Sequence, residues 1–389
     1  MNIIPEIKSR LTDHASWRQT IHTHPELAYQ EDKTSDLVAE KLTSFGIEIE
    51  RGLGKTGVVG TIRYGRSEKR IGLRADMDAL PLQEKNDFAH RSQTDGVMHA
   101  CGHDGHTTML LAAAEYLARN ECFDGTVDLI FQPAEEGEAG AKAMMDDGLF
   151  TKYPVDAVYG LHNWPGLAVG KLAVRKGPMM AAMDVFEVTV KGKGGHAALP
   201  HLAADSVVIA TQLVQAWQHI VSRNVNPTDA AVVSVTQIHA GDAWAVIPNE
   251  VLLRGTIRTF KPAVRDMIES RMQEVARGIC DAHGADFAWW HDRRFPPTIN
   301  SALETENSIR AACQLLGAEN VNPEVEPSTG SEDFGYMLEE KPGCYAFIGN
   351  GPGEGGCLLH SPHYDFNDQV IPIGASYWVQ LVQQELSMS

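Results

Sequence analysis

Several features that mark other classes of protein are missing from this chain of 389 residues. No cluster of Lys and Arg offsets the formal net charge of −18, so a nucleic-acid or anionic-membrane partner is not expected. No apolar run approaches the ~20 residues that cross a bilayer, and the start of the chain lacks the basic-then-apolar order of a secretory signal. The six cysteines are scattered without paired spacing, which is typical of cytoplasmic proteins rather than of a disulfide framework. We therefore expect a cytoplasmic protein.

The composition itself is that of an ordinary globular protein, with 43% hydrophobic and 22% charged residues. The length exceeds what one hydrophobic core usually supports, so two domains are expected. In the first half, helical periodicity alternates with short apolar runs, which indicates an α/β domain with a mostly parallel sheet. We expect helices at 35–45 and 107–119 and strands at 70–74, 127–131 and 157–161.

The rhythm of the sequence changes near residue 182. Alternating segments and two amphipathic segments follow in the order β-α-β-β-α-β of a ferredoxin-like unit. We expect this unit to be an inserted domain at 182–294, between the two parts of a catalytic domain at 1–181 and 295–389. Its expected elements are strands at 184–190, 231–238, 251–259 and 285–290 and helices at 205–223 and 262–284.

Polar clusters follow, or lie close to, the ends of the predicted strands. In open α/β sheets the ligand crevice lies outside the carboxyl ends of the strands, so clusters there can converge in space. Four such clusters lie at 76–78, 99–106, 135–137 and 161–163, and a fifth lies near the C-terminus at 359–363.

The segment around Cys101 carries the sharpest signal. A thiolate and the imidazole of His103, separated by one glycine, can both bind one borderline-soft divalent metal or a closely spaced pair. An isolated Cys-x-His is more often a buried cysteine beside a structural histidine. Here three histidines and Asp104 lie within eight residues, and a core seldom accepts so many polar groups without a partner for them. The segment therefore favours a metal site.

Glu135 and Glu136 form a pair of adjacent carboxylates at a strand exit. Alone, such a pair is usually part of a solvated turn. Because neighbouring side chains point in different directions, one carboxylate can bind a metal while the other holds a water molecule. Metal-assisted hydrolysis needs this division between a Lewis acid and a general base.

Other candidates are weaker when each is taken alone. His162 and His360 are lone histidines, and His363 could replace His360. Asp76 and Asp78 are either turn residues or carboxylates that orient a metal-bound histidine.

Six motifs in one order give the chain a resemblance to a known family. The chain resembles the aminoacylase and carboxypeptidase G-like metallopeptidases, and within them the amidohydrolase branch of hippurate hydrolases, N-acyl-amino-acid deacylases and plant auxin-conjugate hydrolases. The similarity runs from residue 22 to residue 368. The motifs lie at 74–81, 99–106, 132–137, 194–197, 331–334 and 360–368.

This resemblance implies a zinc-exopeptidase-like catalytic domain with two divalent metal ions, which could be Zn, Mn, Co or Ni. It implies that the insert is a lid that forms a homodimer or homotetramer. Glu135 would be the general base, His196 would stabilise the oxyanion, and Arg258 would hold the substrate carboxylate. The implied metal ligands are Cys101, His103, Glu136, His162 and His360, with Asp76, Asp78 and Asp104 as candidates that orient them.

One position departs from the family pattern. Ala245 stands where the family commonly has an asparagine that helps bind the substrate. The departure concerns the carboxylate or carbonyl contacts of the substrate and leaves the metal chemistry unchanged.

The sequence therefore predicts an enzyme that hydrolyses the amide bond of N-acyl amino acids with metal-activated water and a glutamate base. One alternative is a dipeptidase or aminopeptidase on the same two-metal site, but no further carboxylate can be assigned to a free α-amine. The other is a catalytically silent metal-binding scaffold, which would not need a base beside its ligands.

Overall fold

The computed structural model describes residues 1–352 and 358–388. The chain divides into two compact units, each with its own hydrophobic core. Unit 1 comprises Met1–Met179, Ile299–Pro327 and Asp333–Ser389, and unit 2 comprises Met180–Thr298 and Ser328–Glu332. The short return of the chain into unit 2 after residue 327 was not anticipated from the sequence.

Unit 1 is built on an eight-stranded sheet with the order β1-β2-β4-β3-β5-β16-β6-β15. The four central strands, β4, β3, β5 and β16, run parallel. The pairs β1–β2, β2–β4 and β16–β6 are antiparallel, and β15 pairs in parallel with β6. The predicted α/β class with a mostly parallel sheet is therefore confirmed. The strands are β1 (Glu48–Leu53), β2 (Gly57–Tyr64), β3 (Arg70–Asp76), β4 (Gly125–Gln132), β5 (Ala157–Pro165), β6 (Leu172–Ala173), β15 (Val321–Asn322) and β16 (Gly343–Gly351).

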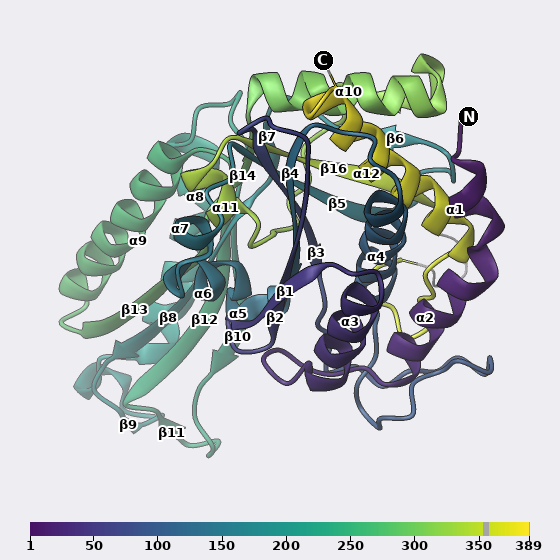
Figure 1. Ribbon diagram of the computed structural model, residues 1–389. Helices are drawn as coiled ribbons and strands as arrows, with labels where there is room; N and C mark the ends of the chain where they lie inside the picture. The colour runs from purple at the N-terminus through teal and green to yellow at the C-terminus, as the bar shows by residue number, and fades with distance from the viewer. Residues whose placement is uncertain (353–357, 389) are drawn as a thin grey trace. The chain divides into compact units, whose positions relative to one another are not determined.

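Helices cover this sheet (Figure 1). The alanine-rich helix α4 (His103–Arg119) packs on β3, and α12 (Ile371–Glu385) packs on α4. Small side chains in α4 let its neighbours approach closely, and nearly all of the helix is buried. The other helices of unit 1 are α1 (Pro5–Ser9), α2 (Leu11–Thr23), α3 (Asp32–Ser44), α5 (Glu135–Glu138), α6 (Gly140–Asp146), α7 (Leu149–Lys152), α10 (Ala302–Leu316) and α11 (Gly335–Glu340).

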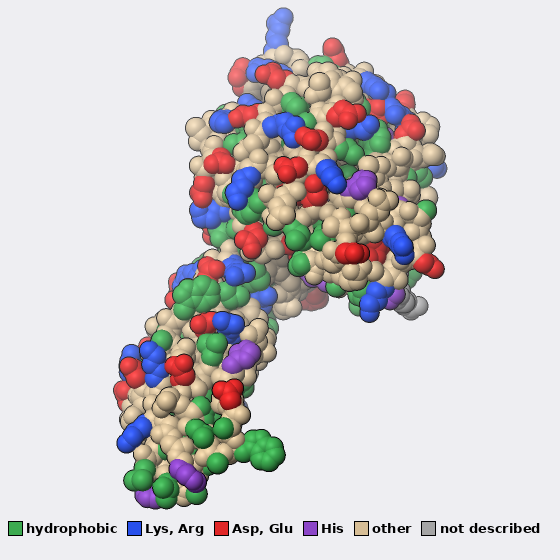
Figure 2. Space-filling model, turned by 90° about the horizontal axis from the view of Figure 1, so that it is seen from below, with side chains coloured by type: hydrophobic (Ala, Val, Ile, Leu, Met, Phe, Trp, Pro, Cys, Tyr) green, Lys and Arg blue, Asp and Glu red, His purple; other side chains and the backbone are tan. Residues whose placement is uncertain are grey.

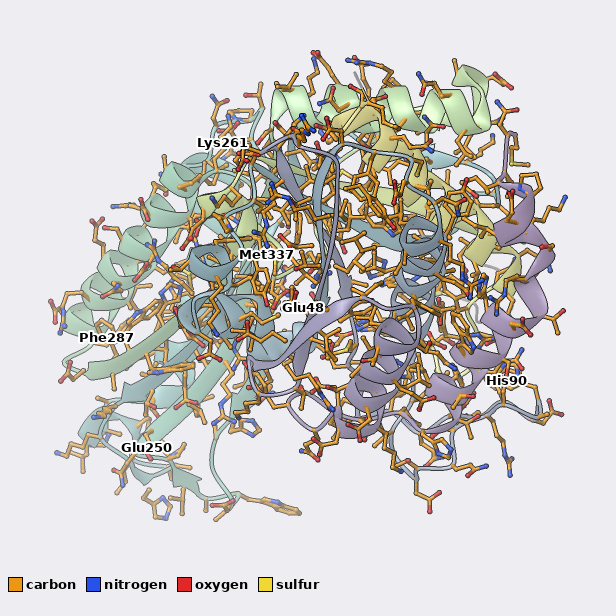
Figure 3. The ribbon with its side chains drawn as sticks, viewed as in Figure 1. Glu48, His90, Glu250, Lys261, Phe287 and Met337 are labelled. Carbon is orange, nitrogen blue, oxygen red and sulfur yellow. The ribbon has the colours of Figure 1, made fainter. Side chains whose placement is uncertain are left out.

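Unit 2 has the predicted order β-α-β-β-α-β and a four-stranded antiparallel sheet in the order β10-β12-β8-β13. Glu250 and Phe287, labelled in Figure 3, lie on two of these strands. Two short strands, β9 and β11, also pair with each other, and β9 carries His196. The elements are β8 (Ala182–Lys191), β9 (Gly195–His196), α8 (Ser206–Arg223), β10 (Ala231–His239), β11 (Val246–Ile247), β12 (Glu250–Thr259), α9 (Pro262–Ala282) and β13 (Asp286–Phe295).

Local signals set both long helices of unit 2. The carboxylate of Asp205 accepts the backbone N–H groups of Val207 and Val208, which caps α8. Pro262 occupies the first turn of α9, where its missing N–H is not needed. The apolar faces of both helices pack on one side of the sheet in a single core.

The surface and the cysteines bear on the sequence-based expectations. On the face drawn in Figure 2, Lys and Arg side chains are interspersed with Asp and Glu. Among the described helices, none combines the length and the apolar character needed to span a bilayer. The five described cysteines are free, and Cys357 lies outside the described residues. A cytoplasmic location stays a prediction.

Candidate metal centre

The carboxyl ends of neighbouring parallel strands bring the predicted site residues of unit 1 together. Asp76 ends β3, Glu135 and Glu136 follow β4, and His162 lies near the end of β5. Because β4, β3 and β5 are adjacent, these side chains emerge at one edge of the sheet.

A tight turn places Cys101 and His103 at this edge. Between them Gly102 has a φ of 90°, and a side chain there would meet the amide of Asn163 at 2.2 Å and the hydroxyl of Tyr364 at 2.5 Å. The helix α4 begins at His103 itself, earlier than the predicted residue 107. Both side chains are buried at the start of this rigid helix.

The five predicted ligands form one cluster. Their ligand atoms fall into overlapping groups whose members lie within 4.8 Å of one another. One group contains Cys101, His103 and His162, and another contains Cys101, Glu136 and His360. The Sγ atom of Cys101 lies 3.4 Å from Nε2 of His162, and Nε2 of His360 lies 3.3 Å from Oε1 of Glu136. The two groups overlap at Cys101.

The backbone selects His360 rather than His363. The N–H group of His360 donates to the carbonyl oxygen of Ala100 at 2.7 Å, which fixes this loop beside Cys101. His360 has a φ of 62°, an uncommon conformation for a residue with a side chain. Both histidines are exposed, but within the described residues only His360 belongs to a potential metal-binding group.

Hydrogen bonds set the tautomer of His162. Its Nδ1 lies 2.6 Å from the carbonyl oxygen of Asn163, which can only accept, so Nδ1 carries the proton. The lone pair of Nε2 then faces Cys101. Burial lowers the pKa of His162 well below its ordinary value, so the ring stays neutral, as a metal ligand must be.

Carboxylates orient His103 from behind. Nδ1 of His103 lies 3.3 Å from Oδ1 of Asp78, and the other oxygen of Asp78 accepts the backbone N–H of Glu136 at 2.9 Å. Asp76 lies 3.7 Å from Nε2 of His103 and 2.6 Å from Nδ1 of His106. Asp104, in contrast, contacts the imidazole of His22 at 2.8 Å.

The Asp104 contact belongs to a buried network behind the cluster. Arg18 lies 3.6 Å from Asp104 and donates to Asp365 at 2.8 Å. His90, labelled in Figure 3, lies 3.2 Å from the same oxygen of Asp365. The network thus joins α2 and the start of α4 to the C-terminal loop.

The cluster favours positive charge. Burial opposes a charge on His103, but Asp76, Asp78 and Glu136 raise its pKa to about 10. Burial and the nearby glutamates raise the pKa of the Cys101 thiol well above its usual range. A cation at this point would relieve both the repulsion among the acidic groups and the cost of a buried thiolate.

Unpartnered atoms test whether this donor set fits a metal. Nε2 of His103 and Oε1 of Glu136 are both buried, and within the described residues neither makes a hydrogen bond of acceptable geometry, although Nε2 of His360 lies 3.3 Å from Oε1 of Glu136. Buried polar atoms are nearly always satisfied, so these two atoms need a further ligand. A thiolate, imidazoles and a carboxylate suit a divalent first-row metal. The residues therefore fit.

A second set of contacts, which reasoning from the sequence missed, surrounds Glu135. The N–H group of Asp333 donates to Oε1 of Glu135 at 3.4 Å. The buried Arg74 donates to Oδ1 of Asp333 at 3.1 Å and to Oδ2 of Asp76 at 2.8 Å. An arginine between Leu73 and Ala75 in the buried part of β3 was the available signal, because such a charge is buried only when it is paired.

His196 and Arg258 belong to unit 2, whereas the residues described above belong to unit 1. His196 lies on β9, and its Nδ1 accepts the backbone N–H of Ala198 at 3.1 Å. Arg258 lies on β12 and donates to the carbonyl oxygen of Ile257 at 3.1 Å.

The motifs of this cluster are those of a known family. A model of the peptidase family M20/M25/M40 matches residues 72–384. This chain belongs to that family. The match confirms the resemblance inferred from the six motifs.

Relatives of this M20 chain share nearly its full length. Hippurate hydrolase from Campylobacter jejuni is 42% identical over 386 residues, which cover 99% of this chain and 100% of that protein. N-acetyl-L-cysteine deacetylase from Bacillus subtilis is 41% identical over 364 residues, which cover 93% of this chain and 85% of that protein. A dinuclear metal-binding peptidase of the M20 family from B. subtilis has a similar structure, with a TM-score of 0.85, 34% identity and coverage of 98% of this chain and 100% of that one.

Proposed function

We propose that this chain hydrolyses the amide bond of N-acyl amino acids, with Glu135 as the general base. Two divalent ions, Zn, Mn, Co or Ni, would be held by Cys101, His103, Glu136, His162 and His360. The overlap of two potential metal-binding groups at Cys101 is the observation that carries this proposal. The full-length similarity to hippurate hydrolase and N-acetyl-L-cysteine deacetylase supports the substrate class.

The carboxylate of Glu135 performs the proton transfers. When bound, the metal pair supplies Lewis acidity toward the amide carbonyl and toward water. As water adds to the carbonyl carbon, Glu135 accepts its proton and then delivers that proton to the leaving nitrogen as the C–N bond breaks. The products are a carboxylic acid and an amine. The contact from the N–H of Asp333 fixes one oxygen of Glu135 for this role.

His196 is suited to stabilise the oxyanion. Because its Nδ1 accepts the N–H of Ala198, a neutral ring carries its proton on Nε2. The ring then offers a hydrogen-bond donor to the negative oxygen of the tetrahedral intermediate. The side chain is exposed, so this donor is free to meet a substrate.

Arg258 is suited to bind the carboxylate of the amino acid. The side chain is partly buried, and within the described residues no carboxylate forms an ion pair with it. The nearby Asp184 is occupied by Arg265 and His291. An arginine removed from water without an anion is costly, so a carboxylate ligand would stabilise it.

A comparison of two substrates separates these two roles. Arg258→Ala should raise KM for an N-acyl amino acid by roughly 10-fold or more, because it removes a charge-assisted hydrogen bond made before the transition state. For the carboxyl-amidated analogue, the same substitution should raise KM much less. His196→Ala should instead lower kcat on both substrates by ~10²–10³-fold, as expected for a lost oxyanion donor. Steady-state kinetics of both variants supply the measurement.

Two results would contradict these assignments. If Arg258→Ala raises KM equally for both substrates, the arginine does not bind the carboxylate. The alanine at position 245 then indicates a different substrate class. If His196→Ala changes KM and leaves kcat intact, His196 is a binding residue.

The edge of unit 2 also supports an oligomer. Strand β10 pairs with β12 on one side, and within the described chain no strand pairs with its other side. Ile238, near the end of β10, is 55% exposed. Bare edges with exposed apolar residues promote pairing with a second copy. The proposed lid would therefore form a homodimer, or a homotetramer built from dimers, through β10.

Sedimentation velocity tests this assembly. Wild-type protein should sediment as a dimer or tetramer, and Ile238→Lys should shift it toward smaller species because a charge disfavours edge pairing. Trp290→Lys on the opposite edge strand β13 is the matched control, since Trp290 is similarly exposed at 53%. A monomeric wild type, or dissociation by the Trp290 variant alone, would exclude the β10 interface.

A further inference from the structure

Among the described residues of unit 1, five that are not glycine have a positive φ, a backbone conformation that side chains disfavour, and three of them lie close to one carboxylate. Tyr29, Lys55 and Ala134 have φ values of 62°, 73° and 56°, and none of them is a glycine. Positive φ is uncommon for such residues, and for a bulky residue like tyrosine it is a marked outlier. Strain of this kind persists where the surroundings enforce it, and it concentrates at functional sites.

One buried carboxylate bonds Tyr29 and Ala134 directly and bonds the neighbour of Lys55. Glu31 is fully buried, and its Oε1 accepts the N–H groups of Tyr29 at 3.0 Å and Ala134 at 2.9 Å. Its Oε2 accepts the hydroxyl of Thr56, the residue after Lys55, at 2.5 Å. Ala134 directly precedes Glu135. Glu31 therefore fixes two loops against the segment that carries the proposed base.

The loops that Glu31 fixes form the wall of a pocket of about 460 Å³. This volume lies within the ~300–1,000 Å³ typical of small-molecule sites. Glu136, a proposed metal ligand, also lines this pocket. A group attached to a carbonyl at the metal centre would therefore be within reach of it.

The lining identifies the kind of group that fits. Leu27, Ala79 and Pro81 supply apolar walls. The hydroxyl of Tyr29 donates to the carbonyl oxygen of Glu138 at 2.9 Å, which holds the ring in place, and Nζ of Lys55 lies 4.2 Å from the centre of that ring. An anionic group would meet the exposed carboxylate of Glu138, whereas an uncharged aromatic group would pack on the ring and the apolar walls.

We propose that this pocket binds the acyl group of the substrate and selects uncharged aromatic or bulky apolar acyl groups through the ring of Tyr29. The proposal rests on the proposed amidohydrolase function, because it assigns the acyl side of the same substrate. It makes Tyr29 a specificity-determining residue and Glu31 a positioning residue.

Substrate competition among three acyl groups tests the pocket. We would measure kcat/KM of the metal-loaded enzyme for the N-benzoyl, N-acetyl and N-succinyl derivatives of one amino acid. Wild type should prefer N-benzoyl to both others. Tyr29→Ala should lower the ratio of N-benzoyl to N-acetyl by about tenfold, because the aromatic contact is lost for one substrate only. Tyr29→Phe is the matched control: it keeps the ring, loses the hydroxyl and should retain the ratio.

Three other outcomes would contradict the proposal or the function on which it rests. If Tyr29→Ala lowers kcat/KM equally for the N-benzoyl and N-acetyl derivatives, the pocket does not select the acyl group and the proposal is wrong. If wild type prefers N-succinyl and Lys55→Met abolishes that preference, the pocket binds an anionic group and the proposal is again wrong. If wild type hydrolyses none of the three compounds although its metal content is full, the proposed function itself fails.

Discussion

Glu135→Gln should lower kcat by at least ~10²-fold, because the variant keeps the shape of the side chain and loses the oxygen that accepts a proton. The amide oxygen of glutamine can still accept the N–H of Asp333, so the local structure should persist. Metal content should stay near two ions per chain, as in a dinuclear M20 relative. Steady-state kinetics and elemental analysis of the same preparation provide the check.

Glu136→Gln is the matched comparison for this prediction. Glu136 lies in a potential metal-binding group with Cys101 and His360, so its substitution should lower the metal content together with the activity. Should the two phenotypes be exchanged, the assignment of base and ligand within the pair is reversed.

Removal of metal should abolish turnover. The donor set mixes a thiolate, imidazoles and a carboxylate, and its atoms lie close enough to bind the same cation together. Dialysis against a strong chelator should eliminate activity, and Mn²⁺, Zn²⁺, Co²⁺ or Ni²⁺ should restore it. The melting temperature should also fall on removal, because a ligand that binds only the native state stabilises it.

Elemental analysis makes this prediction decisive. Full activity in protein with verified absence of metal would rule out the metal-dependent mechanism. Restoration by one ion at a much lower concentration than the others would identify the preferred metal.

Elements with strong local signals were predicted well from the sequence. The helices expected at 205–223 and 262–284 appear as α8 (Ser206–Arg223) and α9 (Pro262–Ala282). The strand expected at 285–290 was too short, because β13 extends to Phe295. Its second half is charged and hides the strand pattern, and Arg293 pairs there with Glu269 at 2.6 Å.

The supporting residues around the centre could not be predicted in the same way. Glu31, Arg74 and Asp333 lie far from Glu135 in sequence, and each acts through contacts that depend on how loops meet. The sequence shows an acidic residue in a turn or an arginine in a strand. It does not show from which backbone N–H group the carboxylate will accept a hydrogen bond.

The sequence by itself determined the family and predicted the types of candidate ligand, because the thiol, imidazole and carboxyl groups occur in motifs whose order along the chain can be read directly. The tertiary structure alone decided that His360 rather than His363 joins Cys101, because a backbone bond to Ala100 fixes that loop. It alone decided that Tyr29 lines a pocket beside Glu136. The physical reason is the same in both cases: distances between segments are set by sheet pairing and buried hydrogen bonds, which close only when the whole chain folds.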